Sequence, residues 1–149
     1  MMLAERLLRD LQSTFDGDAW HGTPLRRMLD GIDDERANKR PVANTKTIAE
    51  LLAHVVSWTE IVERRARFEQ FDVSTADDFP DVDGTKFEDW ITRLERAQAK
   101  LVDTVSKLSD ADFDKIVPGR KHTLDFTLRG LIHHSTYHAA QIAMLKKLV

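Results

Sequence analysis

Two histidines near the end of the chain have the spacing of a metal-binding pair. His134 and His138 are four residues apart, and in a helix such residues lie one above the other, so both rings can point at a single atom. The other residues on this face are mostly apolar, namely Leu131, Ser135, Ile142 and Leu145. This pattern predicts that both imidazoles point toward the core of a helical protein. Burying them costs free energy unless their nitrogens find partners, and one divalent ion can serve both.

A third histidine lies in the middle of another apolar helical pattern. His54 is flanked on its own face by Leu51, Val55, Trp58 and Ile61, so this ring is also expected to point inward. Three neutral imidazoles suit zinc, nickel, iron or copper and leave a position open for water or substrate, as in catalytic sites. We expect a divalent metal ion, zinc or nickel, on His54, His134 and His138. The alternative is that backbone carbonyls, water or hydroxyl groups satisfy each buried ring without a metal.

The remaining histidines are weaker candidates for ligands. His133 lies one position off the face of the pair and is expected at the surface or behind the ligands. His122 lies in a basic loop and is expected to be exposed. Trp20 and His21 precede a glycine in a stretch with loop chemistry. We expect them to line the mouth of the site, with packing of the loop as the alternative for His21.

Two residues of the last helix are candidates for substrate contacts or for support of the ligands. Tyr137 and Gln141 lie close to the histidine pair in sequence, and a core amide with a backbone partner is the alternative for Gln141. No residue declares itself as the general base. Trp58 and Trp90, at helical spacing, are expected in the core rather than in a stacking platform.

Several other chemistries are excluded by missing residues. The chain has no cysteine, which excludes disulfides, thiolate ligands and a cysteine nucleophile. No glutamate follows His134, so the metalloprotease helix with its built-in base is missing. Ser135 lacks the glycine-flanked elbow of a triad nucleophile. The Glu-x-x-His spacing of di-iron bundles and a glycine-rich phosphate loop are also absent.

Length and composition favour one globular domain. The 149 residues, 42% hydrophobic and 32% charged, predict a single domain spanning residues 1–149. A net charge of −3 gives no sign of nucleic-acid binding, and we expect Arg64, Arg65 and Arg67 on a solvated helix end. No stretch approaches the roughly 20 apolar residues of a membrane span. Charges interrupt the first apolar residues, so we expect no signal peptide, no membrane association and a cytoplasmic location.

The hydrophobic periodicity predicts four long helices. They cover residues 2–15, 47–70, 85–109 and 124–148, with capping boxes at Thr47 with Glu50 and at Thr85 with Glu88, and a cap at Thr123. A short helix is expected from Pro24 to Gly31, one further turn within 33–41, and a loop over 71–84. No alternation of period two indicates a strand. We therefore predict an all-α four-helix bundle with a short extra helix in its first connection.

Four stretches of the chain resemble the DinB-like or YfiT-like superfamily of metal-dependent four-helix bundles. They are residues 20–24 (WHGTP), 51–58 (LLAHVVSW), 118–120 (PGR) and 134–142 (HSTYHAAQI). The resemblance implies a metal on His54, His134 and His138. Many relatives have glycine where this chain has Ala140, a difference that affects helix packing and not the ligands. Dimers through bundle faces are common in this superfamily, so we expect a homodimer.

The resemblance also suggests a reaction by analogy. Some members use low-molecular-weight thiols, as in bacillithiol S-transferases and mycothiol-dependent maleylpyruvate isomerases. We therefore expect a metal-dependent, thiol-dependent S-transferase or hydrolase acting on a small molecule, with a low-molecular-weight thiol as a candidate partner. The alternative is a non-catalytic helical bundle that binds a metal or ligand, for example in a stress response.

Overall fold

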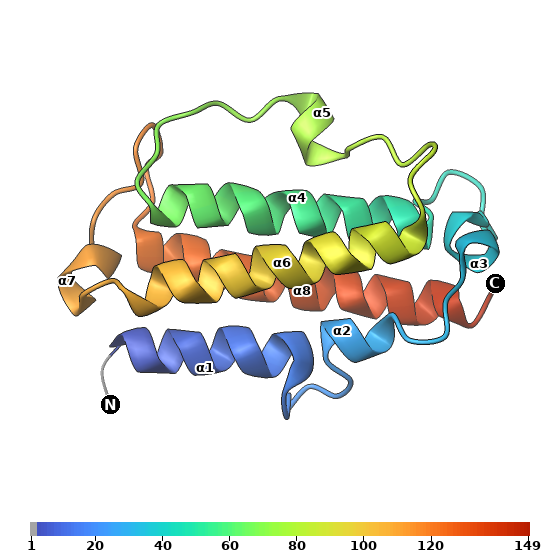
Figure 1. The fold of residues 1–149 in the computed structure, drawn as a ribbon, viewed down its shortest axis with the longest axis horizontal. Coiled ribbons are helices and arrows are strands. Elements are labelled where there is room, and N and C mark those ends of the chain that lie inside the picture. The colour runs from blue at the N-terminus through green and yellow to red at the C-terminus, as the bar shows by residue number, and fades with distance from the viewer. Residues whose placement is uncertain (1–2) are drawn as a thin grey trace.

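The computed structural model describes residues 3–149 and is built from helices (Figure 1). The four long helices are α1 (Leu3–Asp16), α4 (Ile48–Ala66), α6 (Phe87–Ser106) and α8 (Leu124–Lys146), and the short ones are α2 (Leu25–Met28), α3 (Asp34–Asn38), α5 (Thr75–Asp78) and α7 (Asp110–Phe113). Over these described residues there is no strand, and no helix is long and apolar enough to cross a membrane. The predicted all-α bundle is therefore confirmed.

Two of the three predicted helix caps are confirmed. The Thr47 side chain accepts from the Glu50 N–H, and the Glu50 side chain accepts from the Thr47 N–H, which is the capping box at the start of α4. Thr123 accepts from the N–H of Phe126 at the start of α8.

The prediction that Thr85 and Glu88 cap the third helix is wrong. Helix α6 begins at Phe87 after Lys86, which makes no side-chain cap. The Phe87 N–H instead donates to the Asp34 carboxylate of α3, at 2.6 Å. A tertiary contact therefore supplies the acceptor that the sequence pattern assigned to a neighbouring threonine.

Helix α4 ends earlier than predicted, at Ala66 instead of residue 70. Phe68 has a φ of 58°, in the left-handed region that closes a helix. On either side of Phe68, the N–H of Glu69 donates to the Arg64 carbonyl and the N–H of Arg67 donates to the Glu63 carbonyl. Left-handed caps usually use glycine or asparagine, so hydrophobic periodicity could not locate this end.

The connections hold more helix than predicted. The short helix expected over 24–31 is limited to α2, and the single turn expected within 33–41 is α3, so the first connection carries two short helices. Residues 71–84, predicted as a loop, include α5, and α7 lies between α6 and α8. These short helices matter because α5 covers part of the functional site.

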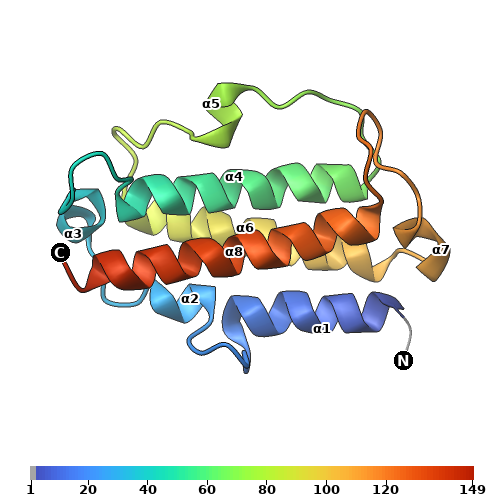
Figure 2. The ribbon, with the colours of Figure 1, turned by 180° about the vertical axis from the view of Figure 1, so that it is seen from behind.

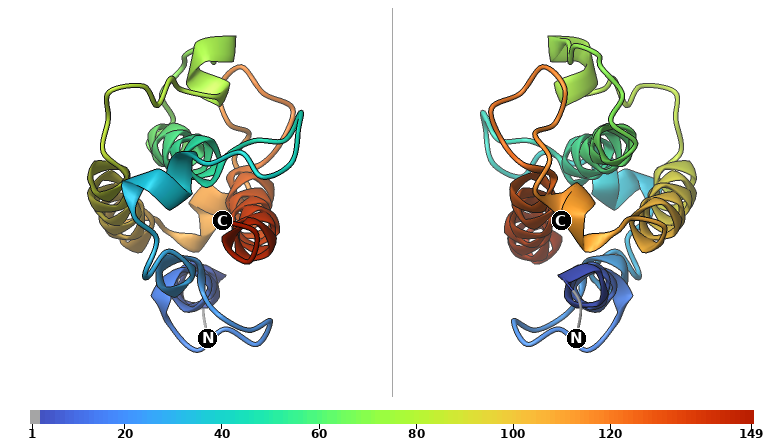
Figure 3. Two further views of the ribbon diagram at one scale, coloured as in Figure 1. Left: turned by 90° about the vertical axis from the view of Figure 1, so that its right-hand side faces the viewer. Right: turned by 90° about the vertical axis from the view of Figure 1, so that its left-hand side faces the viewer.

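Helix α4 is the central helix of the bundle. It packs against both α6 and α8, and α1 packs against α6 and α8 on the other side. In the end-on views α1 and α5 lie on opposite sides of the bundle (Figure 3). Helices α4 and α8 run side by side in opposite directions, with α5 beyond α4 (Figure 2). Fully buried leucines and isoleucines fill the interior, among them Leu52, Leu94, Leu101, Leu128 and Ile142.

Candidate metal centre

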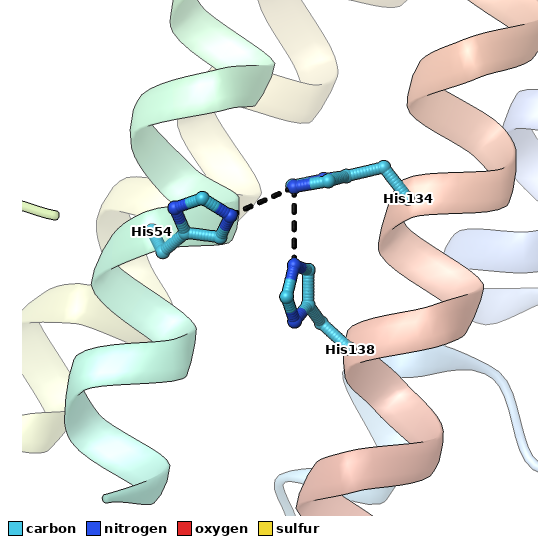
Figure 4. Close-up of side chains that lie close together, drawn as sticks. All are labelled: His54, His134 and His138. Atoms are coloured by element: carbon cyan, nitrogen blue, oxygen red, sulfur yellow. Dashed lines mark hydrogen bonds between the residues drawn. The ribbon is translucent and has the colours of Figure 1, made fainter. Parts of the chain in front are cut away.

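The three predicted histidines converge between α4 and α8 (Figure 4). The Nε2 of His134 lies 2.8 Å from the Nε2 of His54 and 3.1 Å from the Nε2 of His138. One helix supplies His54, and two successive turns of the antiparallel helix supply His134 and His138. The i, i+4 spacing of the pair therefore places both rings against a single ring from the neighbouring helix.

Burial keeps the two α8 imidazoles neutral. His138 is buried, as is His54, and His134 is partly buried. Desolvation, with smaller contributions from His138 and His54, lowers the pKa of His134 to about 4. Desolvation also lowers the pKa of His138. At neutral pH these two rings are uncharged, which is the form that binds a metal ion.

The outer nitrogen of His54 is held by the backbone of α5. Its Nδ1 lies 2.5 Å from the carbonyl oxygen of Asp78. A carbonyl can only accept, so Nδ1 carries the proton and the lone pair of the neutral ring is on Nε2, facing the other histidines. The ring of Phe79 stacks on His54 at 4.1 Å between centroids and limits rotation of the imidazole.

Helix α5 is itself anchored to α4 by polar contacts. A one-turn helix leaves its last carbonyls without intrahelical partners. Ser57 donates to the carbonyl of Asp77 at 2.5 Å, and the Trp58 indole N–H donates to the Asp78 carboxylate at 2.8 Å. With the His54 contact, three side chains of α4 therefore bind the C-terminal end of α5 beside the site.

A neighbouring amide fixes the orientation of His138. Its Nδ1 lies 2.6 Å from the side-chain oxygen of Gln141, three residues along α8. Nδ1 donates in this contact, which again leaves the lone pair on Nε2. The Nδ1 of His134, in contrast, is buried and has no hydrogen-bond partner among the residues described.

This donor set fits a divalent ion better than it fits a closed hydrogen-bond network. His54 and His138 both direct lone pairs at the Nε2 of His134, and one N–H at that atom can satisfy only one of them. A cation accepts all three lone pairs at once. A tetrahedral ion with bonds of about 2.0–2.1 Å separates its ligand atoms by about 3.3 Å, slightly more than the 2.8 and 3.1 Å seen here.

The three rings line a cavity of about 480 Å³. Apart from the histidines, its walls are mostly apolar and aromatic, with two charged groups, Asp78 and Arg65. Within residues 3–149, no cysteine or carboxylate completes the three-histidine cluster as a fourth ligand. An ion bound there would keep a coordination position facing the cavity, which is the arrangement of a catalytic site rather than a closed structural one.

The structure brings some of the other predicted residues to the site and leaves others away from it. Tyr137 lines the cavity, and its ring packs against that of His138 in a T-shaped arrangement, with 5.1 Å between centroids. Gln141 accepts a hydrogen bond from the His138 ring. Trp20 and His21 do not line the cavity. Both are exposed in the loop between α1 and α2, which lies on the opposite side of the bundle from α5 (Figure 3).

The two weaker histidine candidates are exposed, as predicted. His133 is not part of the cluster or of the cavity wall. His122 nevertheless lines the cavity, where its ring stacks on Phe126 at 4.4 Å between centroids.

Sequence reasoning missed four residues of this region, which are Trp58, Arg65, Asp78 and Phe79. Trp58, expected in the core, lines the cavity and donates to Asp78, and Phe79 covers His54. Arg65, expected on a solvated helix end, is partly buried in the cavity wall. A signal for α5 was present, because Ser74 and Asp77 have the spacing of a capping box and form one in the structure. No sequence pattern indicated that this turn would pack over His54.

Comparisons with known proteins identify the family and the fold of this chain. The sequence model described as the DinB superfamily matches residues 19–142. A crystal structure of a DinB-like protein from Bacillus cereus ATCC 10987 superposes with a TM-score of 0.70 at 20% sequence identity, covering 96% of this chain and 90% of that chain. This likeness concerns the fold. No curated protein matches the sequence significantly.

Proposed function

We propose that this chain, which belongs to the DinB superfamily, is a metal-dependent enzyme in which His54, His134 and His138 hold a divalent ion, zinc or nickel. The observation that supports this proposal most directly is the convergence of three Nε2 atoms in the wall of a cavity large enough for a small molecule. His54 and His138 are oriented by Asp78 and Gln141, as metal-binding histidines usually are.

The reaction we propose is thiol-dependent transfer to, or hydrolysis of, a small molecule. A divalent ion on three imidazoles supplies Lewis acidity and lowers the pKa of a bound water or thiol. Among the described residues, Asp78 is the one carboxylate in the cavity wall. Its side chain is oriented by the Trp58 N–H, and we assign it the role of proton acceptor for the incoming thiol or water.

We assign Tyr137, which lines the cavity, a contact with the substrate. Its side chain is 62% exposed, although its ring edge touches His138. A ring in this position offers an apolar face and a hydroxyl to an incoming molecule. Gln141 acts through His138 and is a positioning residue in this proposal.

Catalysis is tested by turnover with a panel of electrophiles and esters, each with and without low-molecular-weight thiols. The proposal expects turnover that a chelator abolishes and added zinc or nickel restores. His54→Ala should remove it, whereas the matched control His133→Ala, an exposed histidine beside the cluster, should retain it. A protein that binds metal stoichiometrically but turns over no thiol or ester would instead be the non-catalytic binding module.

We also propose that the protein forms a homodimer. Met144 on α8 and Leu148 just beyond its end are large apolar side chains, exposed at 64 and 55%, that do not line the cavity. Exposed apolar groups of this kind favour a protein contact. Sedimentation equilibrium tests this, with a concentration-independent monomer mass as the contradicting result.

A further inference from the structure

Arg65 is an arginine without an anionic partner inside a mostly apolar cavity. Its neighbours on α4 are paired: Arg64 lies 2.7 Å from Glu69, and Arg67 lies 2.9 Å from Glu63. Throughout the described part of the chain, no carboxylate forms an ion pair with Arg65. Its guanidinium lies 5.5 Å from the centroid of the Trp58 ring, which is a cation–π contact.

The surroundings of Arg65 do not neutralise its charge. Burial lowers the pKa of Arg65, and the nearby positive charge of Arg120 lowers it further. An arginine still stays protonated in a protein. A partly buried cation next to a second cation is unfavourable unless an anion offsets it.

Arg65 and the three histidines line the same cavity. Arg65 follows His54 by eleven residues, three helical turns, so both lie on the same face of α4, about 16 Å apart along the axis. Side chains in a helix lean toward its N-terminus, which brings the guanidinium back toward His54. The Trp58 ring lies 5.5 Å from the Arg65 guanidinium and 6.0 Å from the His134 ring, between centroids, so a molecule up to about 10 Å long can reach from Arg65 to the histidines.

On the α8 side, the wall of the cavity has a glycine in place of a side chain. Gly130 lies in the interior of α8 and lines the cavity. A Cβ built on it would meet no heavy atom within 4 Å. Glycine inside a helix costs about 0.5–1 kcal/mol relative to alanine, and what this one provides is empty space beside Trp58 and Leu131.

We infer that the cavity binds a small organic acid whose carboxylate pairs with Arg65, whose apolar body lies against Trp58 and Gly130, and whose other end reaches the three histidines. This inference deepens the proposed function because it names the class of substrate for the same site. It does not depend on the metal, since Arg65 and the apolar walls are present in the protein alone. Arginine is the side chain that pairs a carboxylate through two parallel hydrogen bonds.

The test is calorimetric binding of 6-phenylhexanoate and of its uncharged amide to metal-free protein. The acid should bind at least tenfold more tightly than the amide, because a charge-assisted pair is formed only by the acid. Arg65→Gln should remove this preference while leaving the amide affinity within about twofold, and Arg65→Lys should keep part of it. Arg6→Gln is the matched control, because it removes the charge of an exposed arginine on α1. It should behave as the wild type.

Gly130→Leu provides a second test that does not alter charge. It should weaken both probes at least tenfold, with an unchanged circular dichroism spectrum and melting temperature no lower than the wild type. Equal affinity for acid and amide, a preference that survives Arg65→Gln, or no binding of either probe at millimolar concentration would each overturn the inference. If the proposed metal-dependent activity is wrong, the protein will lack bound metal or turnover. It can still bind the acid more tightly than the amide, so the two failures are distinguishable.

Discussion

Replacing Gly130 by alanine should make the protein more stable and its cavity smaller. The glycine lies in the interior of α8, six residues after its first residue and sixteen before its last, and its backbone is not in a left-handed conformation. Alanine at such a position stabilises a helix by about 0.5–1 kcal/mol relative to glycine. The new methyl group would meet no heavy atom within 4 Å, so no steric cost offsets this gain.

For a chain of this length, 1 kcal/mol corresponds to a change in melting temperature of about 2–4 °C. We therefore expect Gly130→Ala to melt about 1–4 °C higher than the wild type in metal-free buffer, measured by calorimetry or circular dichroism. Metal content should not change, because Gly130 does not contact the histidine cluster. A lower melting temperature would refute the claim that the space beside Gly130 is empty and that its role is to provide room for a ligand.

Three further substitutions test the structure and the site. Burial raises the pKa of Glu63, but hydrogen bonds from Arg67 and Thr104 outweigh burial and hold the pKa below its ordinary 4.5. Because this pKa is lower in the folded chain than in the unfolded chain, ionised Glu63 stabilises the fold fully above pH 4.5, and the stabilisation is lost as the pH falls. Glu63→Gln should therefore cost about 1–3 kcal/mol at pH 7, and the difference in urea unfolding should shrink at about pH 3; a constant difference would contradict the pairing. Thr47→Ala should cost about 1 kcal/mol in the same assay through loss of the α4 cap, and no loss would mean that the cap is not stabilising. Asp78→Asn should lower turnover about 100-fold or more at unchanged metal content, because the Asp78 backbone carbonyl accepts from His54 Nδ1 at 2.5 Å, whereas the carboxylate lies farther from that nitrogen, at 3.5 Å; equal turnover would exclude Asp78 as the proton acceptor.

The features that the sequence predicted well depend on local periodicity. The i, i+4 spacing of His134 and His138 determined that both rings share a face, and the apolar face around His54 correctly indicated a ring buried against another helix. The caps at Thr47 and Thr123 also need only residues three positions away. Each of these inferences uses contacts within one or two helical turns.

The features that it missed depend on contacts between distant segments. The start of α6 is set by Asp34, more than fifty residues earlier, and α5 is placed by side chains of α4. Arg65 looked like a solvated charge because its sequence neighbours are charged, yet the three-turn spacing from His54 already put it on the same face. Trp20 was assigned to the mouth on resemblance and loop chemistry alone, and topology places its loop on the far side of the bundle (Figure 3).

Elemental analysis of protein purified without added metal and then incubated with zinc or nickel tests the central claim most directly. The account predicts about one equivalent of divalent metal per chain in the wild type and in His133→Ala, because one ion satisfies three imidazoles at once. It predicts loss of that equivalent in His54→Ala. A wild-type protein without stoichiometric metal, or a His54→Ala protein that retains it, would contradict the account.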